Sequence, residues 1–272
     1  KAISQINDEG INLVANALAQ SNDHILHFFT ILRKELAFYT GCLNLHERLE
    51  EMKEPSCFPN PVASAERKYS FSEMFDVCLA LKMKSKIVGN DLDADNKSLF
   101  IITGANQGGK STFLRSVGLA QLMMQSGMFV PAESFTANIC DELYTHFKRE
   151  EDRTMKSGKF DEELSRMNDI TNHIKSNAVL LFNESFAATN DREGSEIARQ
   201  IVQALLEKNL KVFFVTHLYE FAHGFYNTMK ENAVFLRAER KADTTRTFKL
   251  IEREPLETSY GIDVYDKVFG SK

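Results

Sequence analysis

Between residues 22 and 52 the apolar side chains recur mostly every three or four positions, with polar residues between them and no proline. This periodicity predicts a long amphipathic helix, because residues at that spacing lie on one helical face. At about 1.5 Å per residue the helix would extend on the order of 45 Å, long enough to reach another module. The periodicity alone leaves open whether the helix extends like a lever or packs flat on its own domain. Its apolar positions are Ile25, Phe28, Phe29, Leu32, Leu36, Tyr39, Leu43 and Leu49.

A proline-rich stretch at 54–61 follows this helix and predicts a boundary, because proline interrupts helical hydrogen bonding. Beyond it, short β-branched and aromatic runs alternate with helical patterns, which indicates an α/β fold with a mainly parallel sheet and helices on both faces. A charged stretch at 237–246 separates the last two strands, which are predicted to form an antiparallel edge hairpin. Strands are expected at 99–103, 143–147, 179–183, 212–216, 233–236 and 247–251, and helices at 112–126, 161–175, 192–207 and 218–224.

Residues 104–112, G-A-N-Q-G-G-K-S-T, lie directly between an apolar run and a helical pattern. They satisfy G-x-x-x-x-G-K-[ST], the loop that cradles the phosphates of a nucleoside triphosphate. Glycine can take backbone angles closed to other residues, so successive N–H groups can surround phosphate oxygens. Lys110 adds a positive charge, Ser111 can place its hydroxyl on Mg²⁺, and the following helix directs its positive end at the phosphates. The expected nucleotide-binding residues are Gly104, Ala105, Asn106, Gln107, Gly108, Gly109, Lys110, Ser111 and Thr112.

Asn183 and Glu184 end the apolar run that begins at Val179, where such a sheet delivers its metal-side and water-activating groups. Glu184 can act as a general base toward an attacking water. Asn183 stands where a carboxylate would normally hold Mg²⁺ through its hydration shell, and a neutral amide adds no charge there. Weaker metal binding or slower turnover is one interpretation. The other is a harmless variation, because Ser111 and the phosphates already hold the ion.

His217 follows the apolar run at 212–216 and would emerge at the same edge of the sheet. An imidazole there can sense the γ-phosphate or orient the nucleophilic water. A single histidine at a strand end is more often structural, but three polar strand ends converging on one phosphate site favour the functional role. Residues 190–199 read as a capped helix start, and their N–H groups are also candidates to complete the nucleotide site of a second copy.

The formal net charge of −5 provides no electrostatic case for nucleic-acid binding by this chain alone, although it does not exclude a local basic patch. The cysteines form no C-x-x-C pair, so they predict thiols in a reducing cytoplasm and not a zinc or disulfide framework. No apolar run approaches the roughly 18 residues of a membrane span, and no signal peptide pattern opens the chain. Since the chain begins with Lys1, we expect it to be a piece of a longer protein.

Four motifs together resemble the C-terminal ATPase region of MutS-related DNA mismatch repair proteins. Residues 101–112 resemble that family's T-G-P-N-M-G-G-K-S-T loop, with Ala105 replacing proline and Gln107 replacing methionine. Residues 126–132 are similar to G-x-x-V-P-A, residues 216–221 to T-H-Y-F-E-L, and residues 259–262 to the S-Y-G-L that opens the C-terminal dimerising helices. By the same resemblance, Val88 and Asn90 lie in the segment that borders the adenine, and the helix at 22–52 corresponds to part of a lever toward DNA-encircling parts.

Two motifs depart from the family pattern. The D-E-x-G-R-G-T-S signature reads N-E-S-F-A-A-T-N at 183–190, so its aspartate, glycines and arginine are absent while Glu184 and Thr189 are retained. The S-T-F-x-x-E loop, expected to reach the γ-phosphate on the partner, falls near 157–163, where only Phe160 and Glu163 fit. Either Ser157 or Gly158 would occupy its contact position. These changes indicate a divergent MutS-like branch.

The resemblance implies a P-loop NTPase domain of the ABC type that hydrolyses ATP with Mg²⁺, dimerises as a homodimer and couples nucleotide state to mismatched or branched DNA in the full-length protein. In these terms Lys110, Glu184 and His217 are the catalytic residues, and Ser111 with Asn183 places the metal. We expect a lever segment at 1–60, the ATPase domain at 61–255 and a dimerisation segment at 256–272. The alternative is a nucleotide-controlled binding switch with negligible hydrolysis. An ATPase of the SMC or recombination type, whose head is divided by a long coiled coil, is disfavoured by the contiguous chain.

Overall fold

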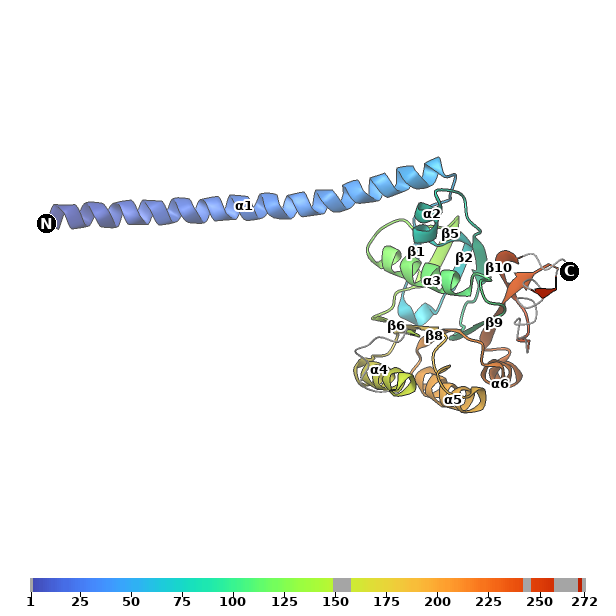
Figure 1. Cartoon of the computed structure of the whole chain (residues 1–272). Helices are drawn as coiled ribbons and strands as arrows, with labels where there is room; N and C mark the ends of the chain where they lie inside the picture. The colour runs from blue at the N-terminus through green and yellow to red at the C-terminus, as the bar shows by residue number, and fades with distance from the viewer. Residues whose placement is uncertain (1, 149–157, 242–245, 257–268, 271–272) are drawn as a thin grey trace. The chain divides into compact units, whose positions relative to one another are not determined.

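The computed structural model describes the backbone of residues 2–148, 158–241, 246–256 and 269–270 (Figure 1). The chain divides into two compact units, one ending at Glu51 and the other beginning at Met52.

The first unit is the single helix α1, Ala2–Glu51. The predicted helix is confirmed, but it begins 20 residues earlier than the sequence pattern indicated. The added part includes Gly10, and the weak helix propensity of glycine makes a helix harder to predict in that part. Large apolar side chains along α1 are exposed, from Ile11 at 66% to Leu43 at 62%. The exposed apolar positions are Ile11, Leu13, Val14, Leu18, Ile25, Leu26, Phe28, Phe29, Ile31, Leu36, Phe38, Tyr39 and Leu43.

The second unit is built on a six-stranded sheet in the order β10-β9-β4-β8-β7-β6. The strands from β9 to β6 pair in parallel, and β10 pairs with β9 antiparallel, which confirms the mainly parallel sheet and the edge hairpin. The strands are β4 (Leu99–Thr103), β6 (Leu143–Phe147), β7 (Val179–Asn183), β8 (Lys211–Val215), β9 (Ala233–Arg240) and β10 (Arg246–Glu252). Part of the charged stretch at 237–246 is therefore strand, because β9 continues to Arg240.

Helices cover both faces of this sheet, as predicted (Figure 1). One face carries α3 (Lys110–Gln125), which contacts β7 and β8, and the opposite face carries α4 (Lys159–His173), α5 (Asp191–Glu207) and α6 (Tyr219–Met229). Each of these helices lies within a few residues of its predicted range. The α/β class is thus confirmed in the part of the chain that the structure describes.

A second, four-stranded sheet in the order β1-β5-β2-β3 was not predicted from the sequence. Its strands are short, and the burial pattern of β2 alternates irregularly around a register shift, so the two-residue periodicity of a strand is weak. The elements of this region are β1 (Asn60–Val62), the 3₁₀ turn η1 (Ser64–Glu66), β2 (Tyr69–Met74), α2 (Val77–Met83), β3 (Asn90–Asp93) and β5 (Ser134–Asn138).

Alternate residues of the central strands build two different cores. Phe100 of β4 and Phe213 of β8 stack at 4.1 Å between ring centroids, and both contact Tyr69 of the second sheet. The intervening residues, such as Ile101 and Phe214, join the core formed with α5 and α6. Both faces of these strands are therefore buried, which explains why they read as continuous apolar runs. Burial of two aromatic-rich faces holds the strands in register.

Lys211, the first residue of β8, lies between the two sheets and is only 6% exposed. Its Nζ donates to Oδ1 of Asn138 at 2.6 Å and lies 4.3 Å from the centroid of the Tyr69 ring. Burial, assisted by the charge of Arg67, lowers the pKa of Lys211 to about 7. A charged lysine at this place therefore opposes folding near neutral pH.

We predict that the free energy of unfolding rises with pH above 7 because of Lys211, and that Lys211→Met removes this rise. Between the folded pKa and that of an exposed lysine, the unfolded chain binds more protons, so raising the pH favours the folded state. Urea unfolding at pH 7, 8 and 9 should show the wild type gaining on the order of 1–3 kcal/mol relative to Lys211→Met. Lys208→Met, at an exposed lysine, is the control. Equal pH slopes for wild type and Lys211→Met would contradict the prediction.

We also predict opposite effects of alanine at two helical glycines. A Cβ on Gly194 of α5 would lie 2.4 Å from the carbonyl oxygen of Phe186, whereas a Cβ on Gly224 of α6 meets nothing within 4 Å. Gly224→Ala should stabilise by about 0.5–1 kcal/mol through helix propensity. Gly194→Ala should destabilise by about 1–3 kcal/mol, because the backbone has to move. Urea midpoints measured side by side decide this, and stabilisation by both variants would refute the clash.

Candidate functional site

The loop between β4 and α3, called the phosphate loop after the sequence motif that it carries, contains three residues with positive φ. Gly104 and Gly109 have φ of +113° and +94°, angles that strongly favour glycine. Gln107 between them also has a positive φ, +61°, and Asn106 and Gln107 are exposed. Gly109 is the N-cap of α3 and no side chain caps the helix, so the N–H groups of its first turn are available to an anion. Ser111 and Thr112 lie in this first turn.

Lys110 is folded back onto its own loop. Its Nζ donates to the carbonyl oxygens of Gly104 at 2.8 Å and Ala105 at 3.0 Å, and the residue is 4% exposed. Burial lowers the pKa of Lys110 to about 8, while the charge of Glu184 opposes this shift. The ammonium group is therefore poised among oxygen acceptors beside the loop, and a phosphate oxygen can replace them as its partner.

The structure brings Ser111 and Asn183 together, 72 positions apart in the chain. The hydroxyl of Ser111 donates to Oδ1 of Asn183 at 2.8 Å, at the end of β7. Both side chains present oxygen, the ligand type that Mg²⁺ prefers, so the donor set fits this ion with a neutral amide in place of a carboxylate. Among the described residues no three His, Cys, Asp or Glu side chains form a cluster that could hold a metal ion by themselves.

Glu184 and His217 form a direct pair at the ends of β7 and β8. Nε2 of His217 lies 3.1 Å from Oε1 of Glu184, and both side chains are about one third exposed. The hydrogen bond from His217 lowers the pKa of Glu184 below its usual range, against the effect of burial, and Lys110 contributes in the same direction. A carboxylate kept ionised beside the phosphate loop can orient a water molecule and accept its proton. The predicted catalytic trio of Lys110, Glu184 and His217 thus lies at one edge of the sheet.

The β9–β10 hairpin packs directly against the phosphate loop, a contact that the sequence pattern did not indicate. A Cβ on Gly108 would lie 2.7 Å from Cβ of Ala238, and one on Gly109 would lie 3.3 Å from the carbonyl oxygen of Phe248. The guanidinium of Arg246 donates to Oε1 of Gln107 at 2.7 Å. The glycines of this loop are therefore required by close packing as well as by their backbone angles.

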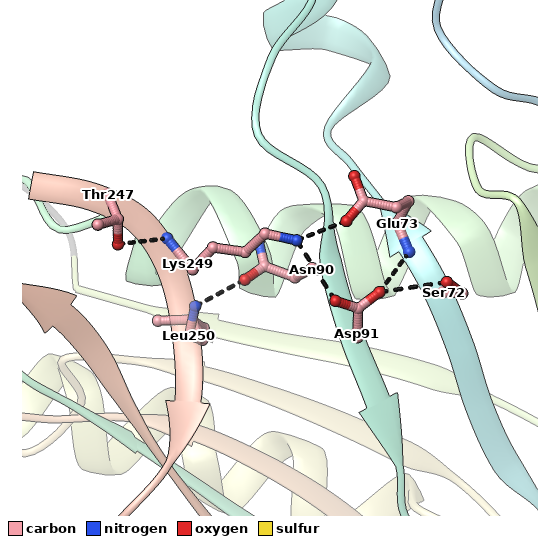
Figure 2. A network of polar contacts seen from close by, with 7 residues as sticks. All are labelled: Ser72, Glu73, Asn90, Asp91, Thr247, Lys249 and Leu250. Carbon is pink, nitrogen blue, oxygen red and sulfur yellow. Dashed lines mark hydrogen bonds and ion pairs between the residues drawn. The ribbon is translucent and has the colours of Figure 1, made fainter.

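Figure 2 shows how the same hairpin joins the second sheet beside Asn90. The N–H of Leu250 donates to Oδ1 of Asn90 at 2.7 Å, and Asn90 is buried. The ammonium of Lys249 lies 2.5 Å from Oε1 of Glu73 and 3.3 Å from Oδ2 of Asp91. Against the effect of burial, the N–H of Glu73 and the charge of Lys249 keep the pKa of Asp91 low.

One strand, β10, therefore connects the segment expected to border the adenine with the phosphate loop. Asn90 is held by this strand, while Val88, two residues earlier, is 39% exposed at the surface of the same segment. Lys249 and Leu250 were not among the expected site residues. Their role depends on the packing of β10 beside β3, and the sequence carries no signal for that packing.

The turn after Glu184 adopts unusual backbone angles. Glu184 has a φ of +55° and Phe186 a φ of +62°. Phe186 stands where the signature motif has its first glycine, so a bulky residue occupies a left-handed conformation that typically costs about 1–3 kcal/mol. Such conformations persist only where surrounding contacts hold them.

Two further motifs have structural roles in the described chain. Asn190 is the N-cap of α5 and accepts the N–H of Glu193 at 3.0 Å, so the predicted capped helix start is confirmed. Phe160 and Glu163 lie within α4, and Glu163 is buried with its carboxylate bonded to the N–H of Phe186. Ser157 and residues 259–262 lie outside the described residues, whereas Gly158 is the N-cap of α4.

None of the described helices is long and apolar enough to cross a membrane.

Family comparison identifies both parts of the chain. Residues 100–270 match the family described as MutS domain V, and residues 1–52 match the MutS2 N-terminal domain. The second match covers the long helix α1, and the first covers the phosphate loop, β7 and β8 with their polar ends, and the β9–β10 hairpin.

Individual relatives agree with these matches. The chain is similar to a "DNA mismatch repair protein MutS" of Lactobacillus delbrueckii, with 27% identity over 93% of this chain and 31% of that relative. A protein of the same description from Clostridium botulinum is 32% identical over 66% of this chain and 20% of its own length. An "Endonuclease MutS2" of Lactobacillus helveticus is 26% identical over 84% of this chain and 30% of its length.

The chain thus spans about a third or less of the length of these relatives. The domain V match alone covers more than half of the chain and contains the whole loop-and-strand-end site. The chain therefore belongs to the MutS family and contains its domain V, the C-terminal ATPase domain.

Proposed function

We propose that this domain binds ATP with Mg²⁺ and hydrolyses it to ADP and phosphate. The observation that carries the proposal is the meeting of three chain segments at one sheet edge, with Ser111 bonded to Asn183 and Glu184 bonded to His217 next to the glycine loop. The family membership and the relatives' description as mismatch repair proteins support this assignment.

In the proposed reaction the loop N–H groups and the first turn of α3 bind the phosphate oxygens. The Lys110 ammonium exchanges its contacts with Gly104 and Ala105 for phosphate oxygens, and this exchange also shifts its pKa upward. Ser111 and Asn183 would hold Mg²⁺, which when bound would neutralise charge on the phosphates.

Glu184 orients a water molecule and accepts its proton as the water oxygen bonds to the γ-phosphorus and the bond to the β–γ bridging oxygen breaks. His217 serves two purposes in this arrangement. Its bond to Glu184 keeps the carboxylate ionised. We expect its exposed ring to contact the γ-phosphate. A carboxylate with a lowered pKa is a weaker base, so positioning of the water contributes more than proton affinity.

In the full-length protein we propose that two such domains dimerise around ATP and that α1 couples the nucleotide state to DNA. ATP favours a closed dimer only to the extent that it binds the closed form more tightly than the open form. The amide at position 183 and the altered turn at 185–188 favour a second candidate, a nucleotide-controlled switch whose hydrolysis is negligible.

We predict that Glu184→Gln abolishes ATP turnover, lowering kcat by at least about 100-fold, while ATP still binds. The amide preserves the shape of the side chain but cannot accept the proton. Steady-state phosphate release with Mg²⁺ measures kcat, and sedimentation with and without ATP measures assembly. If wild type and Glu184→Gln turn over equally slowly and both dimerise with ATP, the switch is the correct function. Failure of both to bind ATP rejects either function.

We predict that Asn183→Asp lowers the Mg²⁺ concentration needed for half-maximal ATP binding or turnover by about tenfold. The new carboxylate adds a negative charge 2.8 Å from the Ser111 hydroxyl, at the proposed metal position. A Mg²⁺ titration at fixed ATP gives the half-maximal concentration. Asn232→Asp adds the same charge at an exposed site on the chain and serves as the control. An unchanged Mg²⁺ requirement in Asn183→Asp would place the metal elsewhere.

A further inference from the structure

The residue after Glu184 is held in a buried polar contact with β6. The hydroxyl of Ser185 lies 2.7 Å from Nδ1 of His146 and also 2.7 Å from the carbonyl oxygen of His146. Ser185 is fully buried and His146 is 1% exposed. The two residues are 39 positions apart, so this contact depends on the parallel pairing of β6 with β7.

The other nitrogen of the His146 ring determines the direction of these hydrogen bonds. Nε2 lies 3.0 Å from the carbonyl oxygen of Glu163, which can only accept, so Nε2 carries a hydrogen. Burial lowers the pKa of His146, which favours the neutral ring. In the neutral ring Nδ1 is an acceptor, as is the carbonyl oxygen of His146, so the single hydrogen of the Ser185 hydroxyl is shared between these two acceptors.

The carboxylate of Glu163 holds the next residue of the turn. Its Oε2 accepts the N–H of Phe186 at 2.7 Å, and Glu163 is 2% exposed. The His146 ring stacks on the Phe186 ring, with 5.4 Å between centroids and 21° between planes. His146, Glu163, Ser185 and Phe186 therefore form one connected group, here called the positioning cluster.

We propose that Ser185, His146 and Glu163 are positioning residues that fix the Glu184 carboxylate beside the phosphate loop. The inference rests on the proposed function of Glu184. The N–H of Glu184 is bonded to the carbonyl oxygen of Val215 at 2.9 Å, so β8 holds one side of the turn and the positioning cluster holds the other.

The need for such a cluster follows from the backbone. Neither Glu184 nor Phe186 adopts a positive φ by intrinsic preference, and the glycine that would ease the turn is absent at 186. Without the bonds to Ser185 and Phe186, the turn would relax toward ordinary angles. The Glu184 carboxylate would then leave its 3.1 Å contact with His217.

The first test is Ser185→Ala, which removes a single oxygen atom from the cluster. Ser116→Ala is the matched control, because Ser116 is also a buried serine, bonded to the carbonyl oxygen of Phe113 in its own helix. We expect Ser185→Ala to lower kcat for ATP at least about tenfold while the Kd for ATP changes less than about threefold. Ser116→Ala should keep both within about twofold. An equal loss of kcat and of affinity for ATP, or an unchanged kcat, overturns the proposal.

The second test compares two substitutions of Glu163. Glu163→Gln keeps an oxygen that can accept the Phe186 N–H, whereas Glu163→Leu removes it. We expect Glu163→Gln to retain kcat within about threefold and Glu163→Leu to lose at least about tenfold. Equal kcat values for the two variants overturn the role of this carboxylate. If Glu163→Leu does not fold, Ser185→Ala still decides the proposal.

A readout without turnover separates this inference from the ATPase assignment. The position of the Glu184 carboxylate is compared in crystal structures of the wild type and Ser185→Ala, both without nucleotide. In Ser185→Ala we expect Oε1 of Glu184 to leave its 3.1 Å contact with Nε2 of His217. An unchanged contact overturns the positioning role. If the wild type hydrolyses no ATP, the ATPase assignment fails, and this comparison alone decides the cluster.

Discussion

The parallel pairing of β4, β8 and β7 is the constraint on which the rest of the site depends. Residues 99–102 pair with 212–215, and those pair in turn with 180–183, so the carboxyl ends of three strands lie at one edge. The polar residues that follow each strand then emerge next to one another without any local contact between them. The buried aromatic and aliphatic faces of these strands supply the driving force for that pairing.

The β9–β10 hairpin adds a second constraint, because it contacts both the phosphate loop and the second sheet. Ala238 and Phe248 pack against loop glycines, while Lys249 and Leu250 bond to residues of β2 and β3. A nucleotide that moves the loop must therefore also act on this hairpin, and through it on the second sheet. This arrangement links the phosphate loop to β3, which begins at Asn90 in the segment expected to border the adenine.

Each of the two charged side chains next to the phosphate loop, Lys110 and Glu184, already has a polar partner within the protein. Lys110 is satisfied by carbonyl oxygens of its own loop, and Glu184 is paired with His217. Breaking these contacts costs free energy that nucleotide binding has to repay, which makes the contacts sensitive to what is bound. The neutral amide of Asn183 lowers the negative charge at this edge relative to the signature with aspartate. The site combines the complete loop motif with an amide where the family signature has a carboxylate.

The loop, the central strands and most helices could be predicted from the sequence, because those features depend on local periodicity and on glycine at defined spacings. The bounds of β4 and β7 follow directly from runs of apolar residues buried on both faces. Lys110, Ser111, Asn183, Glu184 and His217 could be named because each follows such a run or lies in the loop motif. Only the tertiary structure revealed the second sheet, the hairpin over the loop, and the contacts of His146 and Glu163 with the turn after Glu184. Those features join residues far apart in the chain, and pairing between distant strands is decided by packing that no single segment encodes.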